Sequence, residues 1–262
     1  MFAKAGGNLG WALAPMTVFG LAGLTGWRTA LIVVGLLGLA ALVALMSQSA
    51  LLSDGKDKTH NSSGQEPLAV RSIFLSPVIL LCFAYFIFLA IAMIGVQNFL
   101  PAILLILHDF PLTVGSSALT AFLLGSSAGT VAGALMADQT QRHNSIIAGG
   151  LGLSAVAIVF VGYLEVPGSV IALLAFAGFA IGITLPSRDM LVRKVTPRGA
   201  SGRVFGFVYS GLDAGSAVAP VTVGILLDRG ETRMVLWLLA VMLVLAIMTT
   251  ILIGRLNSRS SR

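Results

Sequence analysis

Five residues of the chain match a pattern that performs nucleophilic chemistry in other proteins. Gly125-Ser126-Ser127-Ala128-Gly129 fits the G-x-S-x-G pattern of the hydrolase nucleophile elbow. That elbow requires a strand before the serine, whereas this segment lies in the middle of a long apolar run. Small residues at four-residue spacing, continued by Gly133, are typical of faces along which membrane helices pack closely. We therefore interpret the segment as a packing face and predict no catalytic residue and no enzyme activity.

Cofactor and metal chemistry have equally weak support. Gly150-x-Gly152-x2-Ala155 is similar to a dinucleotide fingerprint, but it lacks the strand–helix–strand context that gives the pattern its meaning. We interpret it as a helix interface. The single cysteine, Cys82, excludes a disulfide framework and a cysteine-rich metal site. We predict no cofactor and no metal.

Asp213 is the only acidic residue well inside an apolar run. A carboxylate in hydrocarbon costs several kcal/mol and usually marks an ion or substrate path. Asp213 is therefore our candidate for proton coupling. The alternative is a structural role, in which Asp213 is hydrogen-bonded to Tyr209 or to a neighbouring helix.

The elements that would position these residues are membrane helices. The chain has 262 residues, of which 57% are hydrophobic and 10% charged, whereas soluble domains carry about 25% charged residues. A spanning helix needs about 20 apolar residues. Eight such runs predict an all-α membrane protein with eight transmembrane helices: 6–24, 29–47, 77–105, 112–136, 145–164, 168–187, 204–227 and 233–254.

The basic residues predict the orientation of these spans. With the N-terminus inside, the inner segments hold thirteen of the sixteen lysines and arginines: Lys4, Lys56, Lys58, Arg71, Arg142, Arg188, Arg193, Lys194, Arg198, Arg203, Arg255, Arg259 and Arg262. The outer segments hold Arg28, Arg229 and Arg233. This positive-inside bias predicts that both termini are cytoplasmic. It also accounts for the net charge of +6, so we predict a lipid bilayer and no nucleic acid as partner.

An internal repeat indicates the larger architecture. Residues 6–18 match residues 211–223 at seven of thirteen positions without gaps, including Ala14-Pro15 against Ala219-Pro220. The repeat unit is six helices, and both copies begin inside, as in parallel repeats. We therefore predict three parts: the last two helices of an N-terminal bundle at 1–47, a cytoplasmic loop at 48–76 and a complete C-terminal six-helix bundle at 77–262. The first four helices of the first bundle are then expected to be missing.

Three motifs carry a resemblance to the major facilitator superfamily. Gly10-x3-Ala14-Pro15-x4-Gly20 is similar to the fifth-helix motif of its antiporters, with Ala14 in place of the usual glycine. Gly133 to Asp138, followed by Arg142, resembles the loop between helices eight and nine, in a degenerate form. Ser201 to Asp228 resembles the eleventh helix. The resemblance covers the whole chain, as helices five to twelve of a twelve-helix fold, and implies a bacterial inner-membrane location.

The resemblance also implies roles for several residues. Asp138 would contact the start of the fifth helix across the two halves and so act in gating. Arg188 and Asp189 could pair with each other or with Arg203, or could serve only as membrane anchors. The full set of gating candidates is Asp138, Arg142, Arg188, Asp189 and Arg203. The cavity-lining candidates are Tyr85, Gln97, Asn98, Thr184 and Tyr209. The helix-packing and hinge candidates are Gly10, Ala14, Pro15, Gly215, Ala219 and Pro220.

The function that follows from the resemblance is secondary transport of a small solute by alternating access. The Ala14-Pro15 motif favours proton-coupled efflux, with Asp213 handling the proton. Two alternatives stay open: uptake of a metabolite by the same fold, and a non-transporting membrane remnant or assembly partner.

Overall fold

The computed structural model describes residues 26–47, 76–137, 143–197 and 201–260. Two units form within the chain, residues 1–70 and 71–262. Within the first, the described residues form helix α2, Trp27–Ser47. Among its residues whose side chains the structure describes, the apolar stretch is Leu31–Val43. The first expected span, 6–24, lies outside the described residues.

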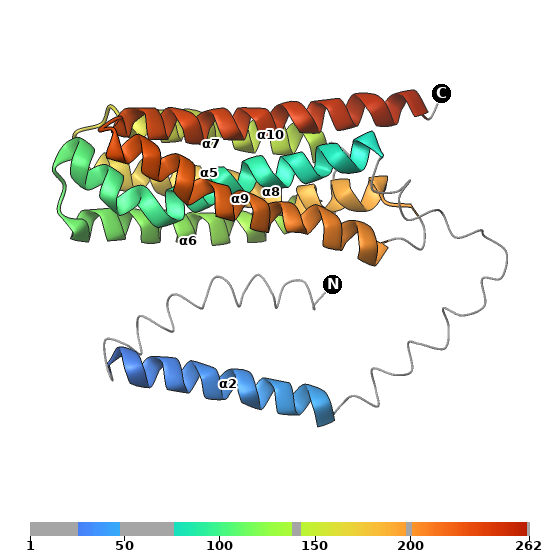
Figure 1. Cartoon of the computed structure of the whole chain (residues 1–262), viewed down its shortest axis with the longest axis horizontal. Helices are drawn as coiled ribbons and strands as arrows, with labels where there is room; N and C mark the ends of the chain where they lie inside the picture. Colours follow the sequence, from blue (N-terminus) through green and yellow to red (C-terminus); the bar gives the residue numbers. More distant parts are fainter. Residues whose placement is uncertain (1–25, 48–75, 138–142, 198–200, 261–262) are drawn as a thin grey trace. The chain divides into compact units, whose positions relative to one another are not determined.

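The second unit is a bundle of six helices (Figure 1). They are α5 (Pro77–His108), α6 (Leu112–Ala137), α7 (His143–Val161), α8 (Pro167–Val195), α9 (Ser201–Asp228) and α10 (Thr232–Ser260). All six are long and apolar enough to cross a membrane. The expected count of eight spans is therefore not supported, because the described residues contain six candidate spans. The all-α class is confirmed for the described residues.

Helix boundaries follow local sequence signals. Proline stands at the first position of α5 and of α8, where its missing N–H leaves no hydrogen bond unmade. Asp109 ends α5 in the left-handed conformation, and its N–H bonds the carbonyls of the last turn. Helix α8 continues eight residues beyond its expected end at 187, because Pro186 is accommodated inside the helix. Arg188 and Asp189 therefore lie within a helix and not in a loop after it.

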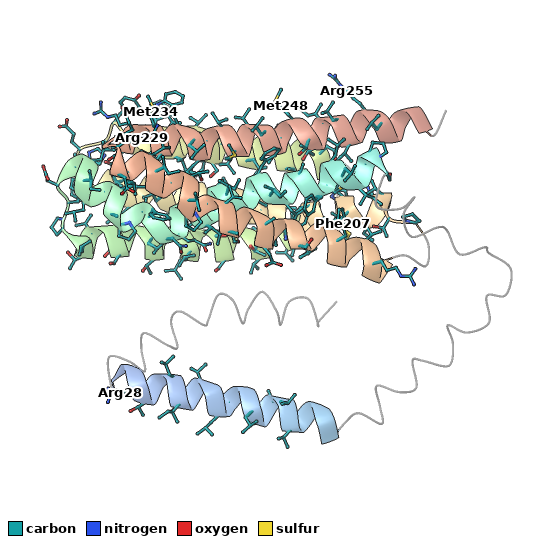
Figure 2. All side chains as sticks on the ribbon, viewed as in Figure 1. Arg28, Phe207, Arg229, Met234, Met248 and Arg255 are labelled. Atoms are coloured by element: carbon teal, nitrogen blue, oxygen red, sulfur yellow. The ribbon has the colours of Figure 1, made fainter. Side chains whose placement is uncertain are left out.

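The six helices pack as two inverted units of three. Helix α6 packs along α8 as α9 packs along α5, and α7 packs on α8 as α10 packs on α5. These contacts correspond when α5–α7 are matched with α8–α10. Because successive helices reverse direction, α5 and α8 run oppositely, so the two units are related by inversion. The exterior of the bundle carries many exposed apolar side chains (Figure 2), as a surface facing lipid requires.

Glycines allow the closest helix pairs to approach. A Cβ at Gly125, Gly129 or Gly133 of α6 would collide with backbone carbonyl groups of α8, and one at Gly178 would collide with the carbonyl of Phe122. The interpretation of the Gly125–Gly129 segment as a packing face is thereby confirmed, and Ser127 donates its hydroxyl to the Leu123 carbonyl of its own helix. Packing also accounts for Gly215 of α9, which lies against Ile87 of α5.

Candidate functional site

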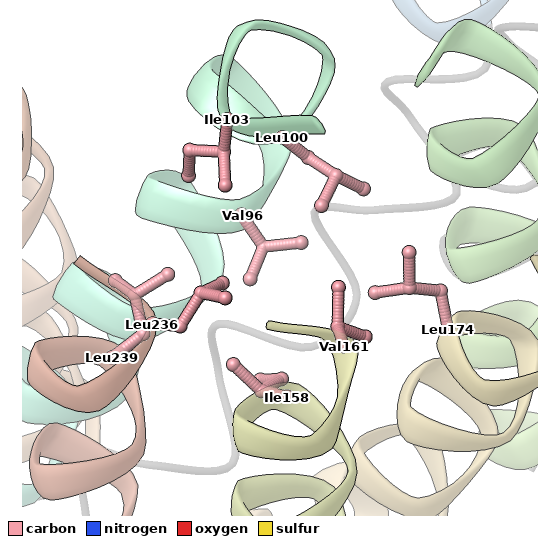
Figure 3. A pocket seen from close by; sticks show the side chains of 8 residues that line it. All are labelled: Val96, Leu100, Ile103, Ile158, Val161, Leu174, Leu236 and Leu239. Atoms are coloured by element: carbon pink, nitrogen blue, oxygen red, sulfur yellow. The ribbon is translucent and has the colours of Figure 1, made fainter. Parts of the chain in front are cut away.

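The two ends of the bundle interior differ in chemistry. Toward the end where α5 joins α6 and α7 joins α8, aliphatic side chains from α5, α7, α8 and α10 meet around a contact region that has no room for a water molecule. Figure 3 shows these side chains, all without polar atoms: Val96, Leu100, Ile103, Ile158, Val161, Leu174, Leu236 and Leu239. A polar solute has no partner in this region. Polar chemistry must therefore be sought toward the other end.

An ion pair lies in that other half of the bundle. Arg188 of α8 donates from Nε to Oδ1 of Asp189 at 3.1 Å. Arg188 precedes the end of α8 at Val195 by seven residues, which is about 10 Å along a helix. Its side chain is 12% exposed, and that of Asp189 is 28% exposed. The expected pairing of Arg188 with Asp189 is confirmed. Arg203, the alternative partner, lies exposed at the start of α9.

Aromatic side chains enclose the guanidinium. Its Cζ lies 4.6 Å from the ring centre of Phe86 and 5.7 Å from that of Tyr209. The Phe86 ring is fully buried, and the two rings lie 4.9 Å apart. A cation over an aromatic face gains electrostatic attraction, and more so when both are withdrawn from water. Arg188 is thus held by helices α5 and α9 as well as by its own neighbour.

Tyrosine hydroxyl groups complete the site, here called the Arg188 cluster and made of Tyr85, Phe86, Arg188, Asp189 and Tyr209. The Tyr209 hydroxyl donates to Asp189 Oδ1 at 2.8 Å. Tyr85 is 2% exposed, and its hydroxyl makes no hydrogen bond of ordinary geometry with the described residues, although the Thr184 hydroxyl lies beside it. The Tyr85 ring packs edge-on against Phe86, with 5.6 Å between the ring centres.

Thr184 lies beside this cluster, one helical turn before Arg188. It is fully buried, and its hydroxyl donates to the Ile181 carbonyl at 2.7 Å, as its alternative role anticipated. The Ser187 hydroxyl is also fully buried and, among the described residues, is unpartnered. Neither Phe86 nor Ser187 was among the expected site residues. Nothing in their local sequence distinguishes them from ordinary membrane residues, since burial beside Arg188 depends on how α5 and α8 pack.

Asp213, the candidate for proton coupling, is not part of the Arg188 cluster. It is exposed on the surface of the bundle, one helical turn beyond Tyr209 on α9. The alternative bond between Asp213 and Tyr209 is wrong, because the Tyr209 hydroxyl donates to Asp189. A tyrosine hydroxyl can donate one hydrogen bond, and the ion-paired carboxylate of Asp189 on α8 accepts it.

The other expected cavity residues lie apart from the cluster. Gln97 is half-buried and Asn98 exposed on α5, eleven or more residues beyond Phe86, which is about 16 Å along a helix. Pro220 is exposed and Ala219 buried in α9. The remaining expected residues lie outside the described residues: Asp138, Arg142, Gly10, Ala14 and Pro15.

Comparison with known proteins agrees with this architecture. The model of the family described as "Major Facilitator Superfamily" matches residues 85–262. The chain therefore belongs to the major facilitator superfamily, and it is a multi-pass integral membrane protein. This membership agrees with the prediction that the protein is not an enzyme, because members of the family are transporters.

A curated relative is the cis,cis-muconate transport protein of Acinetobacter baylyi. The two proteins are 26% identical over 148 residues, which cover 55% of this chain and 35% of the relative. The match thus spans about a third of the relative's length.

Proposed function

We propose that the protein acts in proton-coupled transport of a small solute, in the direction of export. The observation that carries the proposal is the Arg188 cluster, a charged group enclosed by three helices inside an otherwise apolar bundle. Charged residues inside membrane segments are costly and mark substrate or ion pathways. Family membership supports transport, and the name of the relative supports a small organic solute.

The mechanism we propose is alternating access. Two six-helix halves rock against each other, so that the substrate site opens to one side of the membrane at a time. Residues 77–262 form one half in this proposal, and residues 1–47 supply the last two helices of the other, joined by the loop at 48–76. The inner membrane of a bacterium is the proposed location, with both termini in the cytoplasm.

Asp213 is the proposed proton carrier. It lies one turn from Tyr209 on α9 and is exposed at the bundle surface, outside the Arg188 cluster. A carboxylate beside a substrate site can couple the two, because its protonation changes the charge that the site presents to the solute.

Transport by the purified protein in liposomes tests the proposal. Radiolabelled cis,cis-muconate, the solute in the relative's name, serves as first substrate, and an imposed pH gradient as driving force. We expect gradient-driven accumulation by the wild type, and exchange without accumulation by Asp213→Asn. Glu165→Gln is the matched control, because Glu165 is an exposed carboxylate in the turn between α7 and α8. Equal accumulation by Asp213→Asn would exclude Asp213 as the proton carrier.

Uptake is the second candidate, since the relative's name specifies no direction. The same liposomes distinguish the two directions when the pH gradient is reversed relative to the orientation of the protein. Absence of any flux over a panel of organic acids and amphiphilic solutes would instead favour the non-transporting alternative.

A further inference from the structure

The Arg188 cluster already holds a carboxylate, and this carboxylate belongs to the protein itself. Oδ1 of Asp189 accepts hydrogen bonds from the guanidinium of Arg188 and from the hydroxyl of Tyr209, at 3.1 and 2.8 Å. A positive guanidinium and a phenol hydroxyl converging on one oxygen form a recognition site for a carboxylate. The groups that bind the Asp189 carboxylate are therefore the groups that would bind the carboxylate of an external ligand.

Helix geometry does not impose this internal pair. Adjacent residues of an α-helix point in directions about 100° apart and do not face each other. The Arg188 side chain must therefore turn toward Asp189 for its Nε to reach the carboxylate. The contact that joins the two is through Nε alone, whereas arginine and carboxylate bind most strongly through two parallel hydrogen bonds. A carboxylate arriving from outside can take up the stronger, two-point arrangement.

A further donor in the cluster could be bound by such a ligand. The Tyr85 hydroxyl is buried and makes no hydrogen bond of ordinary geometry with the described residues, although the Thr184 hydroxyl lies beside it. Buried polar groups are normally hydrogen-bonded, and leaving one unpaired costs free energy. Tyr85 lies on α5 and its ring packs against Phe86, whose own ring lies under the guanidinium of Arg188. The Tyr85 hydroxyl is therefore our candidate donor to the second oxygen of a carboxylate that Arg188 binds.

The enclosure favours a planar ligand. The faces of Phe86 and Tyr209 flank the guanidinium at 4.6 and 5.7 Å, and Phe86 also packs edge-on against Tyr85. Aromatic walls around a charged group favour a ligand with a flat, apolar body beside its carboxylate. Asp189 is the most exposed charged group of the cluster at 28%, so it can turn outward while Arg188 stays enclosed.

We infer that the Arg188 cluster is a binding site for the carboxylate of a planar organic anion, which binds Arg188 and Tyr85 in exchange for Asp189. The inference rests on the proposed transport function and names its substrate class. Asp189 then acts as a resident competitor that neutralises Arg188 while no substrate is bound. Removal of the competitor is expected to strengthen binding, a result that a purely structural ion pair would not give.

Calorimetric titration of the whole protein tests the inference. The protein is held in nanodiscs of phosphatidylcholine, so that no anionic lipid headgroup competes for Arg188. Benzoate is the probe, and benzamide is its uncharged isostere. We expect benzoate to bind at least about tenfold more tightly than benzamide, because the amide lacks the charge that Arg188 recognises. Inorganic phosphate, added as a competitor, should not displace benzoate.

Variants separate binding from folding. Arg188→Gln should weaken benzoate binding about tenfold or more, Tyr85→Phe about threefold, and Asp189→Asn should strengthen it about fivefold. Because Arg188→Gln leaves Asp189 without its ion pair, the double variant Arg188→Gln with Asp189→Asn serves as a charge-balanced second test and should also fail to bind. Arg233→Gln and Tyr163→Phe are matched controls, since Arg233 lies over the Tyr163 ring at 5.5 Å, away from the cluster.

The outcomes are separable. Weaker or unchanged binding by Asp189→Asn, or tight binding by the folded double variant, overturns the inference. Benzoate binding without any transport in liposomes would leave the inference standing and contradict the proposed function. Transport of uncharged solutes without benzoate binding would leave the proposed function standing and contradict the inference.

Discussion

At the scale of single residues, Arg188 shows how a charge is retained inside a membrane bundle. An isolated cation at such a depth is costly. Here Asp189 neutralises it, Phe86 and Tyr209 cover it, and the Tyr209 hydroxyl satisfies the carboxylate. Each group would be unfavourable alone, and together they compensate one another. Loss of a single member should therefore have a measurable cost.

Tyr209→Phe is the mildest test of this interdependence. It removes the hydroxyl that donates to Asp189 and leaves the ring over Arg188 in place. We expect the free energy of unfolding to fall by about 1 kcal/mol, since hydrogen bonds between membrane helices contribute about 0.6 to 2 kcal/mol. Thermal unfolding in detergent measures the change. Tyr163→Phe, on an exposed ring, is the control and should unfold like the wild type. An equal loss in both variants would contradict the prediction.

The sequence identified most members of this cluster without identifying their partners. Tyr85, Thr184, Arg188, Asp189 and Tyr209 stand out as polar residues in or beside apolar runs. Which of them meet depends on the rotation and depth of three helices, and hydrophobic composition fixes neither in a bilayer. The sequence offered Asp213, on the same helix, as one alternative partner for Tyr209, whereas the packing of the helices brings Asp189 of α8 to it.

At the scale of helices, small residues decide how closely α6 and α8 approach. Gly125, Gly129 and Gly133 follow at four-residue spacing along the face of α6 that meets α8. Their spacing in the sequence was sufficient to predict a packing face, because a four-residue period returns to the same side of a helix. The sequence did not show which helix would pack there.

Gly129→Ala tests this interface. The added Cβ would collide with the Phe179 carbonyl, and a backbone carbonyl cannot move away as a flexible side chain can. We expect the free energy of unfolding to fall by about 2 kcal/mol, the usual cost of an overpacked contact. Gly149→Ala in α7 is the matched control. Its Cβ would meet no atom within 4 Å, so the better helix propensity of alanine should leave stability unchanged or raise it by up to about 1 kcal/mol. Thermal unfolding of both variants measures the difference, and equal destabilisation would exclude a specific close contact.

Helix lengths were predicted with uneven success, for a physical reason. The expected spans of α5, α6 and α9 agree with the structure to within a few residues, because apolar runs end there in polar turns. The end of α8 was predicted too early, because a proline followed by the charged residues Arg188 and Asp189 usually ends a helix in a soluble protein. The helix nevertheless continues through Pro186 to Val195, as membrane helices inside a bundle can, and the two charges pair with each other.

At the scale of the whole molecule, charge separates the two ends of the six-helix bundle. The end formed by the α5–α6, α7–α8 and α9–α10 turns carries, among the described residues, six exposed charged side chains: Asp109, Glu165, Asp228, Arg229, Glu231 and Arg233. Four of the six are acidic. The opposite end carries four exposed basic side chains in the described part of the chain: Arg193, Lys194, Arg203 and Arg255. Basic ends of membrane helices are retained in the cytoplasm, so this asymmetry predicts the orientation of the bundle.

Cysteine labelling in intact cells tests that orientation. Cys82 is buried and is replaced by alanine, and single cysteines are then introduced by Glu165→Cys, Glu231→Cys or Gly202→Cys. All three positions are exposed, and a side chain at Gly202 meets no atom within 4 Å, so labelling reports access from the aqueous phase. We expect a membrane-impermeant maleimide to label positions 165 and 231 directly, and position 202 only after permeabilisation. We expect this pattern because the basic end should stay in the cytoplasm: moving its cations across the bilayer during insertion is unfavourable. Labelling of position 202 in intact cells, with protection of 165 and 231, would reverse the orientation and place the end of the bundle nearest to Arg188 on the outer side of the membrane.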